Sequence, residues 1–180
     1  MIIDELDLAL SNRLLHIQVT NEVGVLTDMP VVVKAPEKEF IPEVIPTVLV
    51  SLIDIRYDPV RQDWGSEVGY TRINGRDVAT VQNAPTPYEI VYQVGVFTLF
   101  QEDDRKAGQT MLKRLPPRTY ISTATDSYYA FLTSFAENDI IGDRRIFRKF
   151  YTYSIFAELE PSEAIVVKLV KERLLTLKQL

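Results

Sequence analysis

The stretch TPYEIVYQVGVFTLFQEDDRKAGQTMLKRLPPR, residues 86–118, changes its hydrophobic period near the middle. In its first part apolar residues alternate, with Ile90, Tyr92 and Val94 on one face, which predicts a long strand over 86–100. Gly95 lies on the other face and marks a bulge or a close approach of another element. The sequence therefore predicts a long strand of a sheet that is followed directly by a helix.

The second part of the stretch predicts that helix. A buried stripe is formed by Ala107, Met111 and Leu115, and Pro116-Pro117 ends the helix. Glu102, Asp103 and Asp104 stand at its start and could bind a hard divalent cation through oxygen ligands. Acids in a first turn also offset the helix dipole, and one of them can cap the helix. Adjacent helical residues do not converge on one point, so the helix-start interpretation is favoured.

Other periodic segments complete the predicted core. TVLVSLIDIRYD (47–58) predicts a central strand that is covered on both faces. RTYIS predicts a short strand, RRIFRKFYTYSIFAELE (144–160) a long one, and PVVVKAP an edge strand. An N-terminal amphipathic helix is predicted from one apolar stripe: Ile3, Leu6, Leu10, Leu14 and Ile17.

Two further helices are predicted in the C-terminal half. DSYYAFLTSFAEN has Asp126 as a possible N-cap, and its inward residues are Tyr128, Phe131, Leu132 and Phe135. PSEAIVVKLVKERLLTLKQL (161–180) predicts a terminal amphipathic helix, whose apolar seam is Val166, Val170, Leu174 and Leu177.

Asn74-Gly75 is the strongest hairpin signal in the chain, because a type I′ turn needs positive φ at both central positions. The flanking strands in YTRINGRDVATVQ are rich in polar residues on both faces. The sequence therefore predicts a β-hairpin arm at about 70–82 that projects beyond the core.

Together these elements predict an α+β fold, with a mostly antiparallel sheet, helices packed on it, the projecting arm and a C-terminal helix. We expect one α+β domain over 1–160 and the amphipathic helix over 161–180.

Composition excludes several classes of function. The net charge of −5 argues against general nucleic-acid binding, and the absence of cysteine excludes disulfides and thiolate metal sites. The N-terminus does not resemble a signal peptide, and no apolar run is long enough to cross a bilayer. We therefore expect a soluble protein that does not contact a membrane.

The standard catalytic and nucleotide-binding patterns are also missing from the sequence. His16 is the single histidine and cannot build a zinc site by itself. The chain has no G-x-S-x-G nucleophile elbow, no G-x-x-x-x-G-K-[ST] loop and no G-x-G-x-x-G loop. We expect no enzyme activity, no catalytic residues, no metal and no cofactor.

Two features are candidate contact sites. Trp64 lies in the polar segment RQDWGSE, where it either forms an interface hot spot or folds back over the core. A basic run beside Phe147 and Phe150 could contact phosphate or an acidic protein, or be a solvated strand beginning; its cations are Arg144, Arg145, Arg148 and Lys149.

The order of these elements resembles bacteriophage tail-terminator and tail-completion (neck) proteins. The resemblance depends on the N-terminal helix, the hairpin arm, the strand YEIVYQVGVFTLF, the helix DRKAGQTMLKRL ended by LPPR, and the later strands, and it covers about residues 3–158. It implies an α+β subunit of a ring, usually a hexamer, that closes the tail and meets the head connector. The partners it implies are further copies, the tail tube or sheath protein and neck proteins, in a virion assembled in the host cytoplasm.

Under this hypothesis the protein works by contacts and binds no specific nucleic-acid sequence. The expected interface residues are Trp64, Arg72, Asn74, Gly75, Arg76, Arg144, Arg145, Arg148, Lys149, Val170 and Leu174. Three alternatives stay open: another virion adaptor (head completion or baseplate), a cellular adaptor, or a metal hydrolase. The hydrolase would use carboxylates from Glu102, Asp103 and Asp104, with Asp139 or Asp143 as a further ligand.

Overall fold

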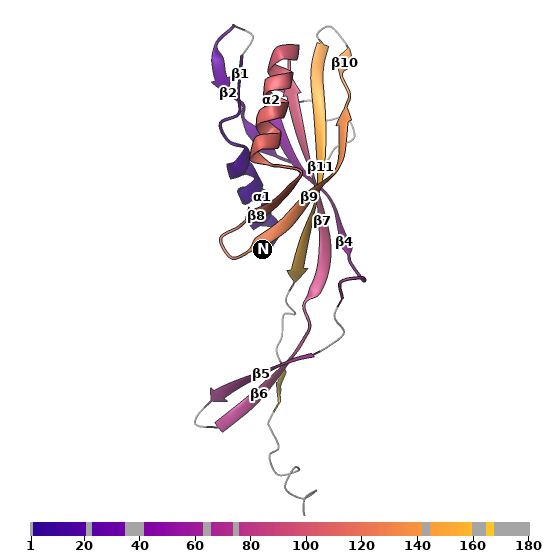
Figure 1. The fold of residues 1–180 in the computed structure, drawn as a ribbon. Helices are drawn as coiled ribbons and strands as arrows, with labels where there is room; N and C mark the ends of the chain where they lie inside the picture. Colours follow the sequence, from indigo (N-terminus) through magenta and orange to yellow (C-terminus); the bar gives the residue numbers. More distant parts are fainter. Residues whose placement is uncertain are drawn as a thin grey trace, which may run out of the picture. The chain divides into compact units, whose positions relative to one another are not determined.

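The computed structural model describes residues 2–20, 23–34, 42–62, 66–73, 76–141, 145–159 and 165–167, and of 66–73, 76–83, 159 and 165–167 the backbone alone. The chain divides into two compact units. We call Met1–Arg56 with Glu89–Ala157 the body, and Tyr57–Tyr88 with Glu158–Leu180 the ribbon unit. Within the described ranges the protein is mixed α/β, with two helices and mainly sheet (Figure 1).

A curled seven-stranded sheet forms the centre of the body. Its spatial order is β3 (Val31–Val33), β4 (Thr47–Tyr57), β7 (Thr86–Thr98), β11 (Arg145–Leu159), β9 (Ser127–Glu137) and β8 (Arg118–Ser122), and β10 (Ile140–Ile141) pairs with β11. The β8–β9, β9–β11 and β10–β11 pairs are antiparallel, whereas β3 runs parallel to β4. The strands predicted over 47–58 and 86–100 are confirmed as β4 and β7, which are neighbours in this sheet.

The prediction that β4 is covered on both sides is correct only for its first half. Residues 47–51 are buried, but Ile53 and Ile55 are exposed. The prediction of an edge strand is confirmed, since β3 ends the strand order. β1 (Gln18–Thr20) and β2 (Leu26–Asp28) form a separate antiparallel pair.

Helices α1 (Ile2–Leu14) and α2 (Gln101–Arg114) pack on one face of the sheet through the apolar stripes predicted for them (Figure 1). The side chains of Leu6, Leu10, Leu14, Ile17, Ala107, Met111 and Leu115 are all fully buried. The sheet contributes Tyr92, whose hydroxyl donates a hydrogen bond to Asp7 Oδ1 at 2.7 Å.

Each of the two helices provides an arginine side chain that donates a hydrogen bond to a carbonyl group at the C-terminal end of the other helix. Arg13 Nε donates to the Arg114 carbonyl at 2.6 Å, and Arg114 Nη1 donates to the Arg13 carbonyl at 3.3 Å. The last carbonyls of a helix have no partner within it, so these contacts replace water at both ends. His16 follows α1 in the left-handed region, with φ 61, and its exposed Nδ1 lies 2.9 Å from Asp28 Oδ2. The predicted N-terminal helix, whose stripe runs to Ile17, therefore ends earlier, at Leu14, and His16 lies outside it.

The helix predicted over DSYYAFLTSFAEN is wrong, because Ser127–Glu137 is the strand β9. β9 pairs with β11 in a register that shifts between Thr152 and Tyr153: Tyr153 faces Leu132, but Thr152 faces Ser134. Thr133 is therefore an extra residue, a β-bulge that reverses the side-chain alternation of β9. Leu132 and Phe135 consequently point to the same face of the sheet.

In the ribbon unit, β5 (Ser66–Ile73) and β6 (Arg76–Asn83) pair antiparallel. Ile73 pairs with Arg76, which agrees with a hairpin at Asn74-Gly75. The predicted projection of this hairpin as an arm beyond the core is not supported and stays a prediction. β12 (Ile165–Val167) pairs with β6, which contradicts the predicted terminal helix at these residues. The strand ladder and the β-branched composition of this segment explain the difference. The rest of the predicted helix lies outside the described residues.

No helix in the described part of the chain is both long and apolar enough to cross a membrane.

Candidate binding site between α2 and β11

The three acids lie in the first turn of α2, which confirms the helix-start interpretation. The expectation that one of them caps the helix is wrong. Phe100 is the N-cap, in an extended conformation, and no side chain caps the helix. Glu102 is exposed and forms a salt bridge with Lys106 at 2.8 Å, which lowers the pKa of its carboxyl group. Asp103 and Asp104 are buried instead, with 3% and 6% of their surfaces exposed. Two of the three acids are therefore buried in the body, which the dipole argument did not predict.

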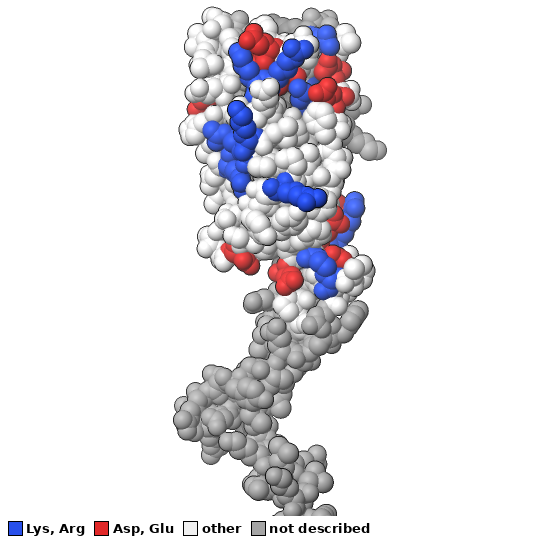
Figure 2. All heavy atoms as spheres, viewed as in Figure 1, with Lys and Arg blue, Asp and Glu red and all other residues white. Residues whose placement is uncertain are grey.

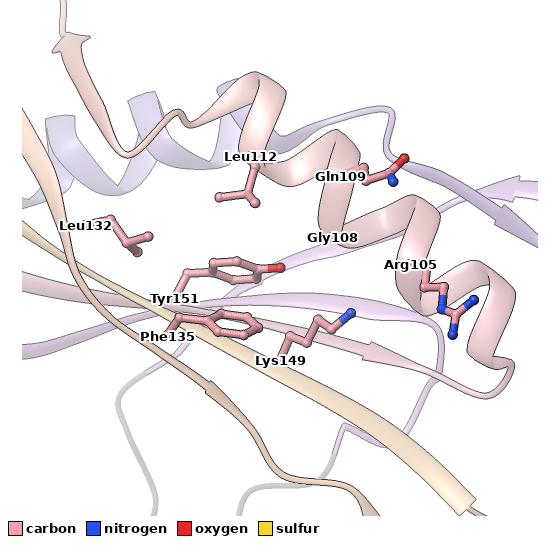
Figure 3. A pocket seen from close by; sticks show the side chains of 8 residues that line it. All are labelled: Arg105, Gly108, Gln109, Leu112, Leu132, Phe135, Lys149 and Tyr151. Carbon is pink, nitrogen blue, oxygen red and sulfur yellow. The ribbon is translucent and has the colours of Figure 1, made fainter.

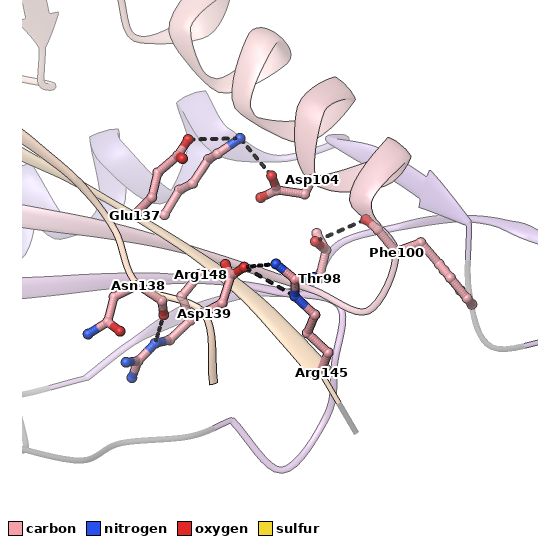
Figure 4. Close-up of polar contacts among 9 residues, drawn as sticks. Thr98, Phe100, Asp104, Glu137, Asn138, Asp139, Arg145 and Arg148 are labelled. Carbon is pink, nitrogen blue, oxygen red and sulfur yellow. Dashed lines mark hydrogen bonds and ion pairs between the residues drawn. The ribbon is translucent and has the colours of Figure 1, made fainter. Parts of the chain in front are cut away.

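Asp104 forms a buried ion pair with Lys149 of β11 (Figure 4). Lys149 Nζ lies 2.7 Å from Asp104 Oδ2 and 3.5 Å from Glu137 Oε1, and the Asp104 and Lys149 side chains are only 9% and 13% exposed. Asp104 Oδ1 is buried and has no hydrogen-bond partner among the residues that the structure describes. A buried pair of this kind costs desolvation energy, and removing one partner leaves an uncompensated charge.

The other described cations of the basic run also have partners within the chain (Figure 4). Arg145 Nη2 lies 2.7 Å from Asp139 Oδ2, and its guanidinium group lies 4.7 Å from the centroid of the Phe147 ring. Arg148 Nε donates to the Asn138 carbonyl at 2.8 Å and lies over the Phe150 ring. An interface formed by Arg145, Arg148 and Lys149 would thus have to compete with these contacts.

A pocket of about 330 Å³ has Lys149 of this ion pair in its lining (Figure 3). We call it the α2 pocket; it is lined by Arg105, Gly108, Gln109, Leu112, Leu132, Phe135, Lys149 and Tyr151. The α2 residues lie at i, i+3, i+4 and i+7, which places them on one face of the helix. The bulge in β9 turns Leu132 and Phe135 toward this face, where the Phe135 and Tyr151 ring centroids are 5.0 Å apart.

Gly108 lets the α2 backbone come close to the sheet. A Cβ atom at this position would lie 2.9 Å from the Tyr151 hydroxyl oxygen, which is closer than such atoms approach in proteins. The isolated glycine inside a helical pattern was the one sequence signal for this close approach. A Cβ at Gly95 would lie 2.9 Å from the Phe97 ring of the same strand and 3.1 Å from the Phe150 ring of β11, and the second contact agrees with the close approach predicted for Gly95.

We expect the effect of Gly108→Ala to depend on Tyr151. Alanine is favoured over glycine in a helix interior by about 1 kcal/mol. In Tyr151→Phe, which lacks the hydroxyl group, Gly108→Ala should raise the free energy of unfolding by about this amount. In the wild type the clash should cancel the gain. Chemical denaturation of the four proteins measures the difference, and an equal gain in both backgrounds would contradict the close approach.

Burial, followed by the nearby charges of Asp104 and Glu137, raises the pKa of Tyr151 to about 12. Because this folded-state pKa lies above the unfolded value of about 10, Tyr151 contributes stability below pH ~10 that is lost as the pH rises toward 12. Burial also raises the pKa values of Tyr92 and Tyr153.

We therefore expect the free energy of unfolding to fall between about pH 10 and pH 12. Denaturant titrations across this range should show a shallower fall in Tyr151→Phe. Tyr120→Phe is the control, because the Tyr120 side chain is 63% exposed. An identical pH dependence in wild type and Tyr151→Phe would contradict the burial argument.

The structure brings only Lys149, of the predicted interface residues, to the α2 pocket. Arg72 lies in β5 and Arg76 in β6, where the backbone alone is described. The remaining candidates fall outside the described residues: Trp64, Asn74, Gly75, Arg144, Val170 and Leu174. Their predicted roles stay predictions.

The acids of the hydrolase alternative that the structure describes form no metal-binding group. Among the described residues no group of three or more histidine, aspartate and glutamate side chains could hold a metal ion. Asp139 pairs with Arg145, and Asp143 lies outside the described residues.

The face of the body shown in Figure 2 carries charges of both signs. On the face in Figure 2, acidic and basic side chains are mixed at one end, while the middle carries mainly basic groups among uncharged ones. Comparison with known proteins adds no identification: no family model matches the chain, and no curated protein matches its sequence.

Proposed function

We propose that the protein is a structural subunit of a bacteriophage virion, a tail-terminator or neck protein that works in a homo-oligomeric ring. The supporting observation is the ribbon unit, in which β5 and β6 pair over eight residues each and form a unit distinct from the body. A two-stranded ribbon is only marginally stable in water and gains stability from a further surface. β12 adds three residues to one edge of β6, and we propose that a neighbouring copy supplies the rest.

The order of elements also supports the proposal. Helix α1, the hairpin β5–β6, the long strand β7, helix α2 and the later strands follow one another as in the resemblance described above. An arm reaching a neighbouring copy makes a head-to-tail contact, and such contacts close into rings when the rotation between subunits allows it. Arg72 and Arg76 would meet acidic groups of the neighbour, and the finished ring would contact the tail tube or sheath and the head connector.

The test removes the outer part of the ribbon. In the deletion variant, residues 71–80 are replaced by a two-residue turn. We expect a folded monomer by circular dichroism and light scattering that cannot complete particles lacking the wild-type protein. The control keeps the full ribbon and carries Arg72→Ser and Arg76→Ser; it should still assemble, because screened surface pairs contribute little. Complete tails formed with the deletion variant would overturn the proposal.

Head completion and the baseplate are alternative positions for a subunit of this kind. Electron microscopy of particles made without the protein distinguishes them. Overlong or unjoined tails support a terminator, empty heads support head completion, and missing distal structures support a baseplate adaptor.

A further inference from the structure

The walls of the α2 pocket leave apolar surface in contact with water. Leu112 is 36% exposed and Phe135 is 50% exposed, although both stand beside the fully buried ring of Tyr151. Figure 3 shows Leu112, Leu132, Phe135 and Tyr151 around one space below the helix. A volume of about 330 Å³ is at the lower end of the range of small-ligand pockets, roughly 300–1,000 Å³. This size suits one large side chain better than a cofactor.

The polar residues of the pocket favour an anionic group beside that side chain. Two of the lining residues, Arg105 and Lys149, are cations, and none is acidic. Lys149 is already paired with Asp104 at 2.7 Å. Arg105 is exposed at the mouth, and no described residue forms a salt bridge with it. Its guanidinium group is thus available to a carboxylate that arrives with the ligand.

We propose that the α2 pocket binds an aromatic side chain with an adjacent carboxylate, presented by an extended segment of a partner protein. The aromatic ring packs against Leu112, Leu132 and Phe135, where ring pairs favour offset or edge-to-face contact. The carboxylate pairs with Arg105. A buried aromatic anchor beside an arginine is the usual composition of an interface hot spot. This proposal does not depend on assembly into an oligomeric ring, because all the residues that line the pocket belong to the body.

Three peptides test the chemistry on the full chain: acetyl-Gly-Phe-Asp-Gly-amide and its versions with Asn or Lys in place of Asp. Binding is followed by amide shifts in nitrogen–proton correlation spectra. We expect saturable shifts at Gly108, Gln109, Leu132 and Lys149, with a Kd on the order of a few millimolar for the Asp peptide. The Asn peptide should bind roughly two- to fivefold more weakly, and the Lys peptide more weakly still.

Three variants separate the contributions of charge and packing. Arg105→Gln should make the Asp and Asn peptides bind equally, whereas Leu112→Ser should weaken both. Arg118→Gln is the matched control, since Arg118 is an exposed arginine of β8 that does not line the pocket; it should change neither. Equal binding of all three peptides, shifts that map elsewhere, or no saturable shift would overturn the proposal. Self-association without peptide that Leu112→Ser weakens would assign the pocket to a second copy and would also overturn it.

Discussion

Replacing Lys149 by methionine is expected to lower the free energy of unfolding by about 3–5 kcal/mol. The methionine keeps most of the side-chain volume but leaves the Asp104 carboxylate 9% exposed and without its cation. Among the described residues Asp104 Oδ1 has no hydrogen-bond partner, and Lys149 Nζ is the cation that pairs with Oδ2. Glu137, which also lies near Lys149, cannot compensate the negative charge of Asp104, because it is an acid as well.

The matched control for this variant is Arg145→Met, on the same strand. The side chains of Arg145 and Asp139 are 58% and 28% exposed, so the loss of that pair should cost less than about 1 kcal/mol. Urea denaturation of both variants measures the contrast.

A double variant distinguishes a buried charge from lost packing. In Asp104→Leu with Lys149→Met both charges are removed, and most of the stability lost in Lys149→Met alone should return. If Lys149→Met and Arg145→Met cost the same, or if the double variant is no more stable than the single one, the pair does not act as a buried ion pair.

Leu10→Ala is expected to destabilise the protein by about 2–5 kcal/mol. Leu10 is fully buried in the middle of the stripe by which α1 packs on the body, so the truncation removes apolar contacts and leaves a cavity. Leu6, Leu10 and Leu14 are the buried residues of α1, and a helix of this length is marginal without tertiary packing.

Leu8→Ala is the control, because Leu8 lies on the same helix and is 63% exposed. Both variants gain the same helix propensity, so their difference isolates the effect of burial. The control should change stability by no more than about 0.5 kcal/mol. Equal effects of the two variants in thermal or urea denaturation would contradict the packing of α1.

The elements with a single uninterrupted period could be predicted from the sequence. Leu6, Leu10 and Leu14 repeat once per helical turn, and the structure buries all three. The apolar residues of β7 alternate as in a strand, and Ile90, Tyr92 and Val94 are buried on one face. The pairing of Ile73 with Arg76 agrees with the hairpin predicted from Asn74-Gly75, since that dipeptide accepts the required backbone angles.

The error at β9 has a specific physical cause. Tyr128, Leu132 and Phe135 are spaced by four and three residues, as on a helix. In the structure Leu132 and Phe135 share a face because the bulge at Thr133 inserts one residue into an alternating strand. A strand with a bulge and a helix thus produce similar local patterns. Only the pairing with β11, which comes from a distant part of the chain, decides between them.

The sequence by itself determined which residues of α1, α2, β4 and β7 form helices and strands, because backbone periodicity and side-chain polarity act between near neighbours. The tertiary structure alone decided that Asp104 meets Lys149 and that α2 covers a pocket on β9 and β11. The acids at the start of α2 looked like ordinary helix-terminal residues, since nothing within one turn indicates that two of them are buried. Asp104 is buried against Lys149 because of the register of β11, a strand more than forty residues away in the sequence. The α2 pocket, which has Lys149 in its lining, depends on the same register.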